Sequence, residues 1–162
     1  MRPAQRRGCK EERISPIVAS NEAGVPEELA MRYVILGARV IEGLIFLVFG
    51  LNGLLHFYNP PPPTGDALSW YGIMAAHHWI NFVAVEQLVG GLLLLVGRFV
   101  PLGLVLLAPV IVNILLYHAL LWPHGYELAM LVLVLEVFLL GVYWRSFAPL
   151  LHPNPEMKTP KL

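Results

Sequence analysis

The stretch from Val34 to Tyr58, VILGARVIEGLIFLVFGLNGLLHFY, constrains the fold of this chain more than any other. As a helix with a rise of about 1.5 Å per residue, it is long enough to cross a hydrocarbon layer of roughly 30 Å. It is apolar around its whole circumference, which is not typical of a surface helix in a soluble domain. Yet Glu42, Asn52 and His56 fall within a narrow arc of this helix, with Arg39 at its edge. One side of the helix therefore needs a polar or closely packed partner.

The composition of the whole chain also indicates a membrane protein. Its 162 residues are 57% hydrophobic and 14% charged, whereas globular domains contain about 25% charged residues. The length predicts a single domain. Cys9 is the only cysteine, which excludes an intrachain disulfide and a CxxC redox pair. Basic residues are scattered and balanced by acidic ones, so nucleic-acid binding has no support.

Three further apolar stretches follow the first, and short connections join them. Together they predict an all-α fold, a transmembrane four-helix bundle with up-down topology. The predicted spans are 34–58, 79–97, 101–122 and 126–144. Four consecutive prolines after the first span exclude a helix there. A short interfacial helix is expected at 67–76, among aromatic residues that suit a membrane interface.

The termini are expected to lie outside this bundle. Residues 1–30 are polar and lack apolar periodicity, which predicts a disordered N-terminal tail. Met31 directly precedes the first span, so translation starting at Met31 is an alternative. Residues 31–151 then form the membrane domain, and residues 152–162 a cytoplasmic tail.

The distribution of Lys and Arg predicts the orientation of the bundle. All 11 of them lie before the middle of the first span, in the second connection, or after the fourth span. The first and third connections contain none. Because cytoplasmic loops carry the excess of basic residues, both termini are expected in the cytoplasm.

Four polar residues, each from a different predicted span, lie between the midplane and the outer half of the membrane. These residues are Asn52, Glu86, Asn113 and Glu136. A charge at the bilayer centre costs at least about 2.5 kcal/mol, so we expect the four side chains to converge on one interior site. Two carboxylates in a space of low dielectric cannot both ionise cheaply, so at least one glutamate is expected to be protonated. The residues expected at the border of the site are His56, Tyr117 and Glu42.

Two interpretations of this cluster stay open. Intramembrane carboxylates commonly mark ligand or proton sites. Asn and Glu side chains also join helices by hydrogen bonds without any further role. No CxxCH or HExxH motif is present, so no metal site is predicted, although His56 would be the best single ligand.

Three segments carry a resemblance to a known family. They read VIEGLIFLVFGLNGLLHFY, VEQLVGGLLLLVGRFVPLGLVLLAPVIVNILLYH and LVLEVFLLGVYWRSFAPLL. Over roughly residues 31–151 the chain resembles the DoxX family of small four-helix membrane proteins. That family takes its name from a membrane subunit of a thiosulfate:quinone oxidoreductase, and other members are linked loosely to redox or stress functions. The resemblance implies the fold and a location in the bacterial inner membrane, but it assigns no catalytic residue.

These observations lead us to expect an accessory or quinone-linked subunit of a membrane redox system, with quinone as the implied cofactor. The chain has no flavin motif or nucleotide loop, so a redox centre would come from a ligand or a partner subunit. Two alternatives remain. One is a scaffold without catalysis, in which grooves at Gly50, Gly90 and Gly91 receive a partner helix. The other is a small proton-coupled carrier, which would require a homodimer. The sequence leaves open whether the protein is an enzyme.

Overall fold

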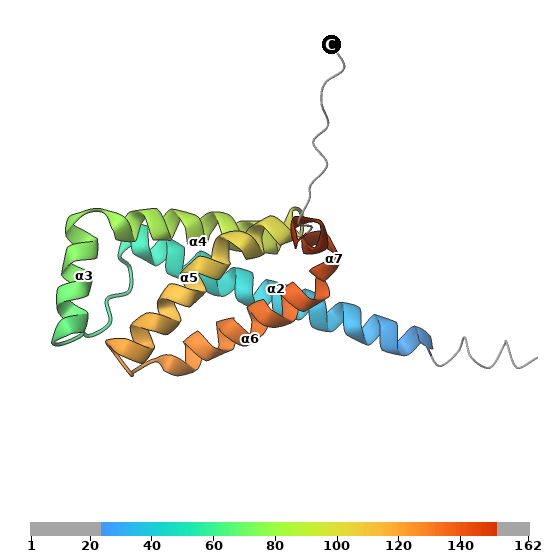
Figure 1. Cartoon of the computed structure of the whole chain (residues 1–162), viewed down its shortest axis with the longest axis horizontal. Helices are drawn as coiled ribbons and strands as arrows, with labels where there is room; N and C mark the ends of the chain where they lie inside the picture. Colours follow the sequence, from blue (N-terminus) through green and yellow to red (C-terminus); the bar gives the residue numbers. More distant parts are fainter. Residues whose placement is uncertain (1–23, 152–162) are drawn as a thin grey trace, which may run out of the picture. The chain divides into compact units, whose positions relative to one another are not determined.

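The computed structural model describes residues 24–151, in which helices are the only regular secondary structure (Figure 1). The elements are α2 (Gly24–Leu55), α3 (Asp66–Ala76), α4 (Trp79–Val96), α5 (Val100–Leu120), α6 (Tyr126–Val142), α7 (Trp144–Phe147) and the 3-10 helix η1 (Ala148–Leu151). Contacts divide the chain into two units, Met1–Val34 and Ile35–Leu162, and the site described below lies in the second.

Three helices are long and apolar enough to cross a membrane, namely Glu27–Leu55, Trp79–Val96 and Val100–Leu120. The helical segments Tyr126–Val142 and Trp144–Leu150 are together also long and apolar enough to cross a membrane, but the chain bends by 72° at their junction. The predicted all-α class is confirmed, because helices are the only regular secondary structure in residues 24–151 and three or four of them have the length and composition of membrane spans.

The ends of α2 differ from those expected from the sequence. The helix already includes residues 24–30, which were expected to be irregular. Pro26 and Glu27 suit a helix start, where a missing N–H is harmless and the helix dipole favours an acidic side chain. The helix ends at Leu55 rather than Tyr58, because His56 takes a left-handed backbone conformation with φ 54°. Residues 1–23 of the expected N-terminal tail and the expected cytoplasmic tail lie outside the described residues.

Adjacent glycines in α4 allow it to pack closely against two helices at once. A Cβ atom at Gly91 would lie 2.8 Å from the backbone oxygen of Gly43 in α2. A Cβ atom at Gly90 would lie 2.6 Å from Leu107 Cγ in α5. Gly50 of α2 approaches α4 in the same way, 2.8 Å from the oxygen of Ala84. Small residues at these positions bring the helix backbones close together, as in other membrane bundles.

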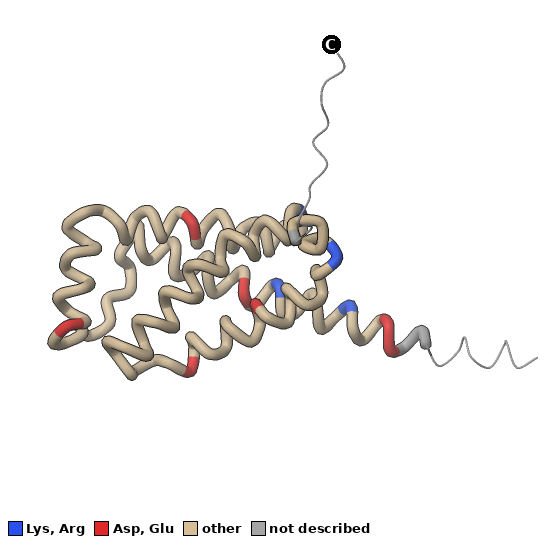
Figure 2. The backbone as a smooth tube through the Cα atoms, in the orientation of Figure 1, with Lys and Arg blue, Asp and Glu red and all other residues tan. Residues whose placement is uncertain are grey.

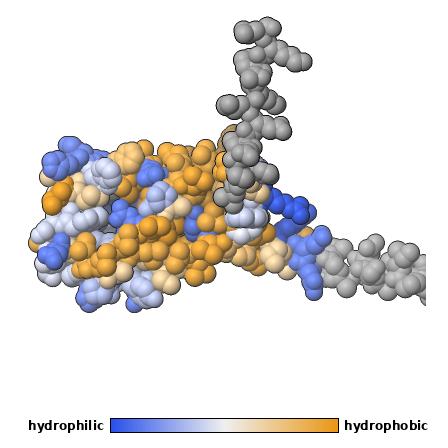
Figure 3. Space-filling model, in the orientation of Figure 1, coloured by the Kyte–Doolittle hydropathy of each residue, from blue (hydrophilic) through white to orange (hydrophobic). Residues whose placement is uncertain are grey.

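The second unit has a small apolar core and an extensive apolar surface. The largest side chains with almost no exposure are Phe46, Leu94, Leu104, Leu107, Ile111, Leu139 and Glu42. On the outside, Phe82 is 61% exposed and Val134 is 60% exposed. Figure 3 shows broad hydrophobic areas over the helices, and Figure 2 shows few charged residues along them. Such a surface is suited to contact with lipid rather than with water.

The loop after α2 is held by the side chain of Asn52. Its Nδ2 donates a hydrogen bond to the Tyr58 oxygen at 3.0 Å, and its Oδ1 accepts one from the Tyr58 N–H at 2.7 Å. The chain then continues through the prolines to α3, where Ala67 is fully buried. Figure 1 shows α3 (green) running across the direction of α4, which it contacts. This placement brings the C-terminal end of α5 beside α3, where the rings of Tyr117 and Trp70 lie close together.

Candidate functional site

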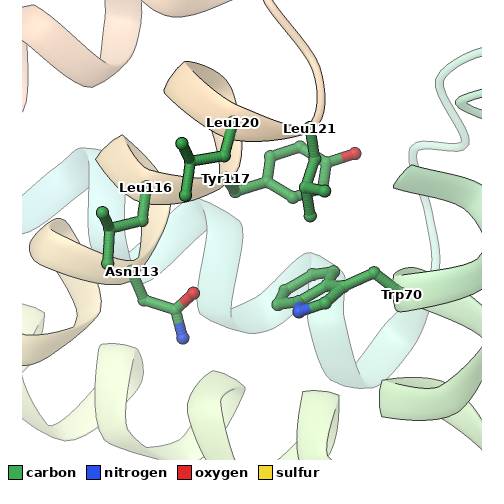
Figure 4. A pocket seen from close by; sticks show the side chains of 6 residues that line it. All are labelled: Trp70, Asn113, Leu116, Tyr117, Leu120 and Leu121. Carbon is green, nitrogen blue, oxygen red and sulfur yellow. The ribbon is translucent and has the colours of Figure 1, made fainter. Parts of the chain in front are cut away.

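A groove lies between α3 and the last turns of α5, with a volume of about 250 Å³. Its lining residues are Trp70, Asn113, Leu116, Tyr117, Leu120 and Leu121 (Figure 4). Trp70 comes from α3. Asn113, Leu116, Tyr117 and Leu120 follow one another at the i, i+3, i+4, i+7 spacing of one face of α5, and Leu121 directly follows that helix. We call this the Trp70–Asn113 groove.

The groove joins an amide group to two aromatic rings. The ring centroids of Trp70 and Tyr117 are 5.1 Å apart, with an angle of 43° between the planes. Figure 4 shows the Asn113 amide facing the same space as the indole of Trp70. The Asn113 side chain is exposed, and Leu116 and Leu120 beside it are 53% and 76% exposed. The groove is therefore open toward the surface that the spans present to lipid.

This arrangement is suited to a flat lipophilic molecule. The amide of Asn113 offers two N–H donors and one carbonyl acceptor. An amide at membrane depth is unfavourable in contact with lipid unless a ligand or partner satisfies it. Aromatic rings pack well against other flat rings. The groove can thus bind and orient a ring that carries a carbonyl group.

A pair of carboxyl groups lies elsewhere, between α2 and α6. Glu42 is 0% exposed and Glu136 is 3% exposed. The two carboxyl groups are close enough to act on each other electrostatically and to share a proton, although no hydrogen bond of ordinary geometry joins them. Within residues 24–151, none of their four oxygens has a hydrogen-bond partner. We call these residues the Glu42–Glu136 pair.

The structure assigns the polar residues singled out from the sequence to different places. Asn52 holds the loop after α2, and His56 follows that helix in an exposed position. Asn113 and Tyr117 share the Trp70–Asn113 groove. Glu86 is half-buried on α4. A single site formed by Asn52, Glu86, Asn113 and Glu136 stays a prediction.

The carboxyl group close to Glu136 belongs to Glu42, which was expected at the border of the site. The reason is the rotation of each helix about its axis. Glu42 lies on the face of α2 that buries Ala38 and Phe46. Glu86 lies off the buried face of α4, whose members are Ala84, Gly90, Gly91 and Leu94.

Sequence reasoning did not include Trp70 in the site. Its indole belongs to α3, and only the packing of α3 brings it beside α5. The aromatic residues after the prolines were the one available signal, and they were assigned to the membrane interface. Among the described residues, no group of three or more His, Cys, Asp and Glu side chains could hold a metal ion.

A protein-family model described as DoxX matches residues 34–119, more than half of the chain. The chain belongs to the DoxX family. The match extends through most of α5 and ends before α6, so it includes Glu42 and Asn113 but not Glu136. The resemblance inferred from the sequence is thereby confirmed. No protein of curated function and no solved structure matches the chain.

Proposed function

We propose that this DoxX-family membrane protein binds a quinone in the Trp70–Asn113 groove and acts as an accessory or quinone-linked subunit of a membrane redox system. The observation that carries the proposal is the combination of one amide and two aromatic rings in a groove open to lipid. The Asn113 amide would donate a hydrogen bond to a quinone carbonyl oxygen. The rings of Trp70 and Tyr117 would contact the quinone ring, and Leu116 and Leu120 its isoprenoid chain.

The side chains of the groove would bind and orient the quinone, but none of them can donate electrons to it. Reduction of a quinone takes up two electrons and two protons. In this proposal the electrons come from a partner subunit, and a homodimer is the alternative assembly. The side chains of the groove hold the quinone ring at a defined depth while electrons arrive.

The proposal includes a location in the bacterial inner membrane with both termini in the cytoplasm. Arg98 lies in the turn between α4 and α5, and Arg145 lies in α7. The loop from 56 to 65 and the connection from 121 to 125 contain no Lys or Arg. With basic connections inside, the Trp70–Asn113 groove lies in the outer half of the membrane.

The scaffold alternative has lost its main support. It relied on glycine grooves that accept a partner helix, but Gly50, Gly90 and Gly91 are covered by helices of the same chain. The carrier alternative has gained an observation in the buried Glu42–Glu136 pair, because proton-coupled carriers use intramembrane carboxyl groups.

The test is equilibrium binding of decylubiquinone to the purified protein in lipid nanodiscs. In Asn113→Leu the dissociation constant should rise by about five- to tenfold, because one hydrogen bond is lost. Asn81→Leu is the matched control, since it removes an exposed amide from α4, away from the groove. Equal affinity in Asn113→Leu and the wild-type protein would refute the proposal.

A further inference from the structure

The Glu42–Glu136 pair has features that packing alone does not explain. One glutamate comes from each of two helices that are remote in the sequence. Both side chains are more than nine-tenths buried, and no oxygen of either has a hydrogen-bond partner in residues 24–151. The neighbouring buried side chains are apolar, among them Phe46 of α2 and Leu139 of α6. Buried polar groups are normally satisfied, so four unpartnered carboxyl oxygens in apolar surroundings call for an explanation.

No basic side chain of residues 24–151 pairs with either carboxyl group, although the Nε of Arg39 is itself buried without a hydrogen-bond partner. Arg39 is one turn away on α2, but its guanidinium lies against Gly97 at the end of α4, where a Cβ atom would be 2.8 Å from Nη2. Neither carboxyl accepts a hydrogen bond from any side chain of residues 24–151. Glu86, the acidic residue of α4, is half-buried and lies off the buried face of that helix. The buried residues of α5 are all apolar or glycine, and Arg145 of α7 is exposed.

We propose that Glu42 and Glu136 form a proton-binding site in which at least one proton is held between the two carboxyl groups at neutral pH. A carboxylic acid O–H of one residue donates to an oxygen of the other, which converts two unpartnered groups into a donor and an acceptor. Two anionic carboxylates close together and away from water would repel strongly, and within the described part of the chain no basic side chain pairs with either of them. The ligand of the site is the proton itself.

This site is separate from the Trp70–Asn113 groove and does not rest on quinone binding. It links α2 to α6, the first and last long helices of the described chain. Uptake or release of its proton changes the charge between these helices. The pair therefore gives the bundle a protonation-dependent contact inside the membrane.

Labelling with dicyclohexylcarbodiimide tests the proposal, because this apolar reagent modifies protonated carboxyl groups. The full-length protein in liposomes is treated at pH 7, digested and analysed by mass spectrometry. We expect an adduct on Glu42 or Glu136 and none on exposed Glu127. In the double variant Glu42→Gln, Glu136→Gln the adduct between α2 and α6 should disappear, since no carboxyl group remains in the pair, whereas either single variant should keep one buried carboxyl that the reagent can modify. Glu86→Gln is the matched control and should leave labelling unchanged.

Infrared spectroscopy of the same samples detects protonated carboxyl groups even if the reagent does not reach the pair. The wild-type protein should show the carbonyl stretch of a protonated carboxylic acid, and this band should be lost in the double variant Glu42→Gln, Glu136→Gln but not in Glu86→Gln. Absence of both the adduct and this band would overturn the proposal. Labelling that sodium chloride suppresses and choline chloride does not would also overturn it, because the site would then bind a metal cation.

Discussion

Two asparagines of the same predicted cluster have different roles at the level of single residues. The Asn52 amide both donates to and accepts from the backbone of Tyr58, so its hydrogen-bonding capacity is used locally. The Asn113 amide faces the Trp70–Asn113 groove and is exposed. The sequence placed both asparagines at a similar depth in their spans. The structure shows that the Asn52 amide is used by the local backbone, whereas the Asn113 amide is free to bind a ligand.

Replacing Asn52 by Ala should destabilise the loop after α2 with little effect on quinone binding. Two hydrogen bonds are lost, but water can reach the freed groups, so the free energy of unfolding should fall by only about 1 kcal/mol. Thermal unfolding in detergent measures this change. Asn59→Ala is the control, because its amide donates a single long bond of 3.3 Å to the His56 oxygen. A loss of decylubiquinone affinity in Asn52→Ala would instead place this residue in the ligand site.

At the level of elements, α4 organises the packing of the second unit. Gly91 faces α2 and Gly90 faces α5, so two adjacent residues define two helix interfaces. The neighbour that each glycine meets is different. A side chain at Gly91 would meet backbone atoms, including the Leu47 nitrogen at 3.0 Å, whereas one at Gly90 would meet the flexible end of Leu107. Backbone atoms cannot move aside without shifting a whole helix.

Gly91→Ala should therefore destabilise the protein more than Gly90→Ala. Overpacking of a close interface costs about 1–3 kcal/mol, and the upper part of that range is expected at Gly91. Unfolding by sodium dodecyl sulfate in mixed micelles measures the difference. Gly141→Ala is the control, because a Cβ atom there meets nothing within 4 Å and alanine favours the helix. The interpretation is wrong if Gly91→Ala is as stable as Gly141→Ala.

At the level of the whole molecule, the described chain combines an apolar surface with an uneven distribution of basic residues. Exposed apolar side chains cover the spans, as Phe82 and Val134 illustrate. Arg98 and Arg145 belong to segments on one side of the spans, while the connections on the other side contain no Lys or Arg. The surface favours a lipid environment, and the basic residues favour one orientation in it.

Reporter fusions test that orientation. Alkaline phosphatase, which is active only in the periplasm, should be inactive when fused after Leu162 and active when inserted near Thr64. Green fluorescent protein at the same two positions is the control, and its fluorescence should follow the opposite pattern. Active phosphatase after Leu162 together with inactive phosphatase near Thr64 would reverse the proposed topology and place the Trp70–Asn113 groove in the inner half of the membrane.

The sequence by itself determined the all-α membrane fold and the DoxX family, because hydropathy, helix length and sequence similarity are properties of continuous stretches. It also marked Glu136 and Asn113 as polar residues inside spans. Only the tertiary structure decided that Glu136 faces Glu42 and that Asn113 faces Trp70. The physical reason is that such contacts depend on the rotation of each helix about its axis and on the position of α3. Both are set by packing between distant segments, such as the close contact of Gly43 with Gly91, rather than by the local pattern of residues.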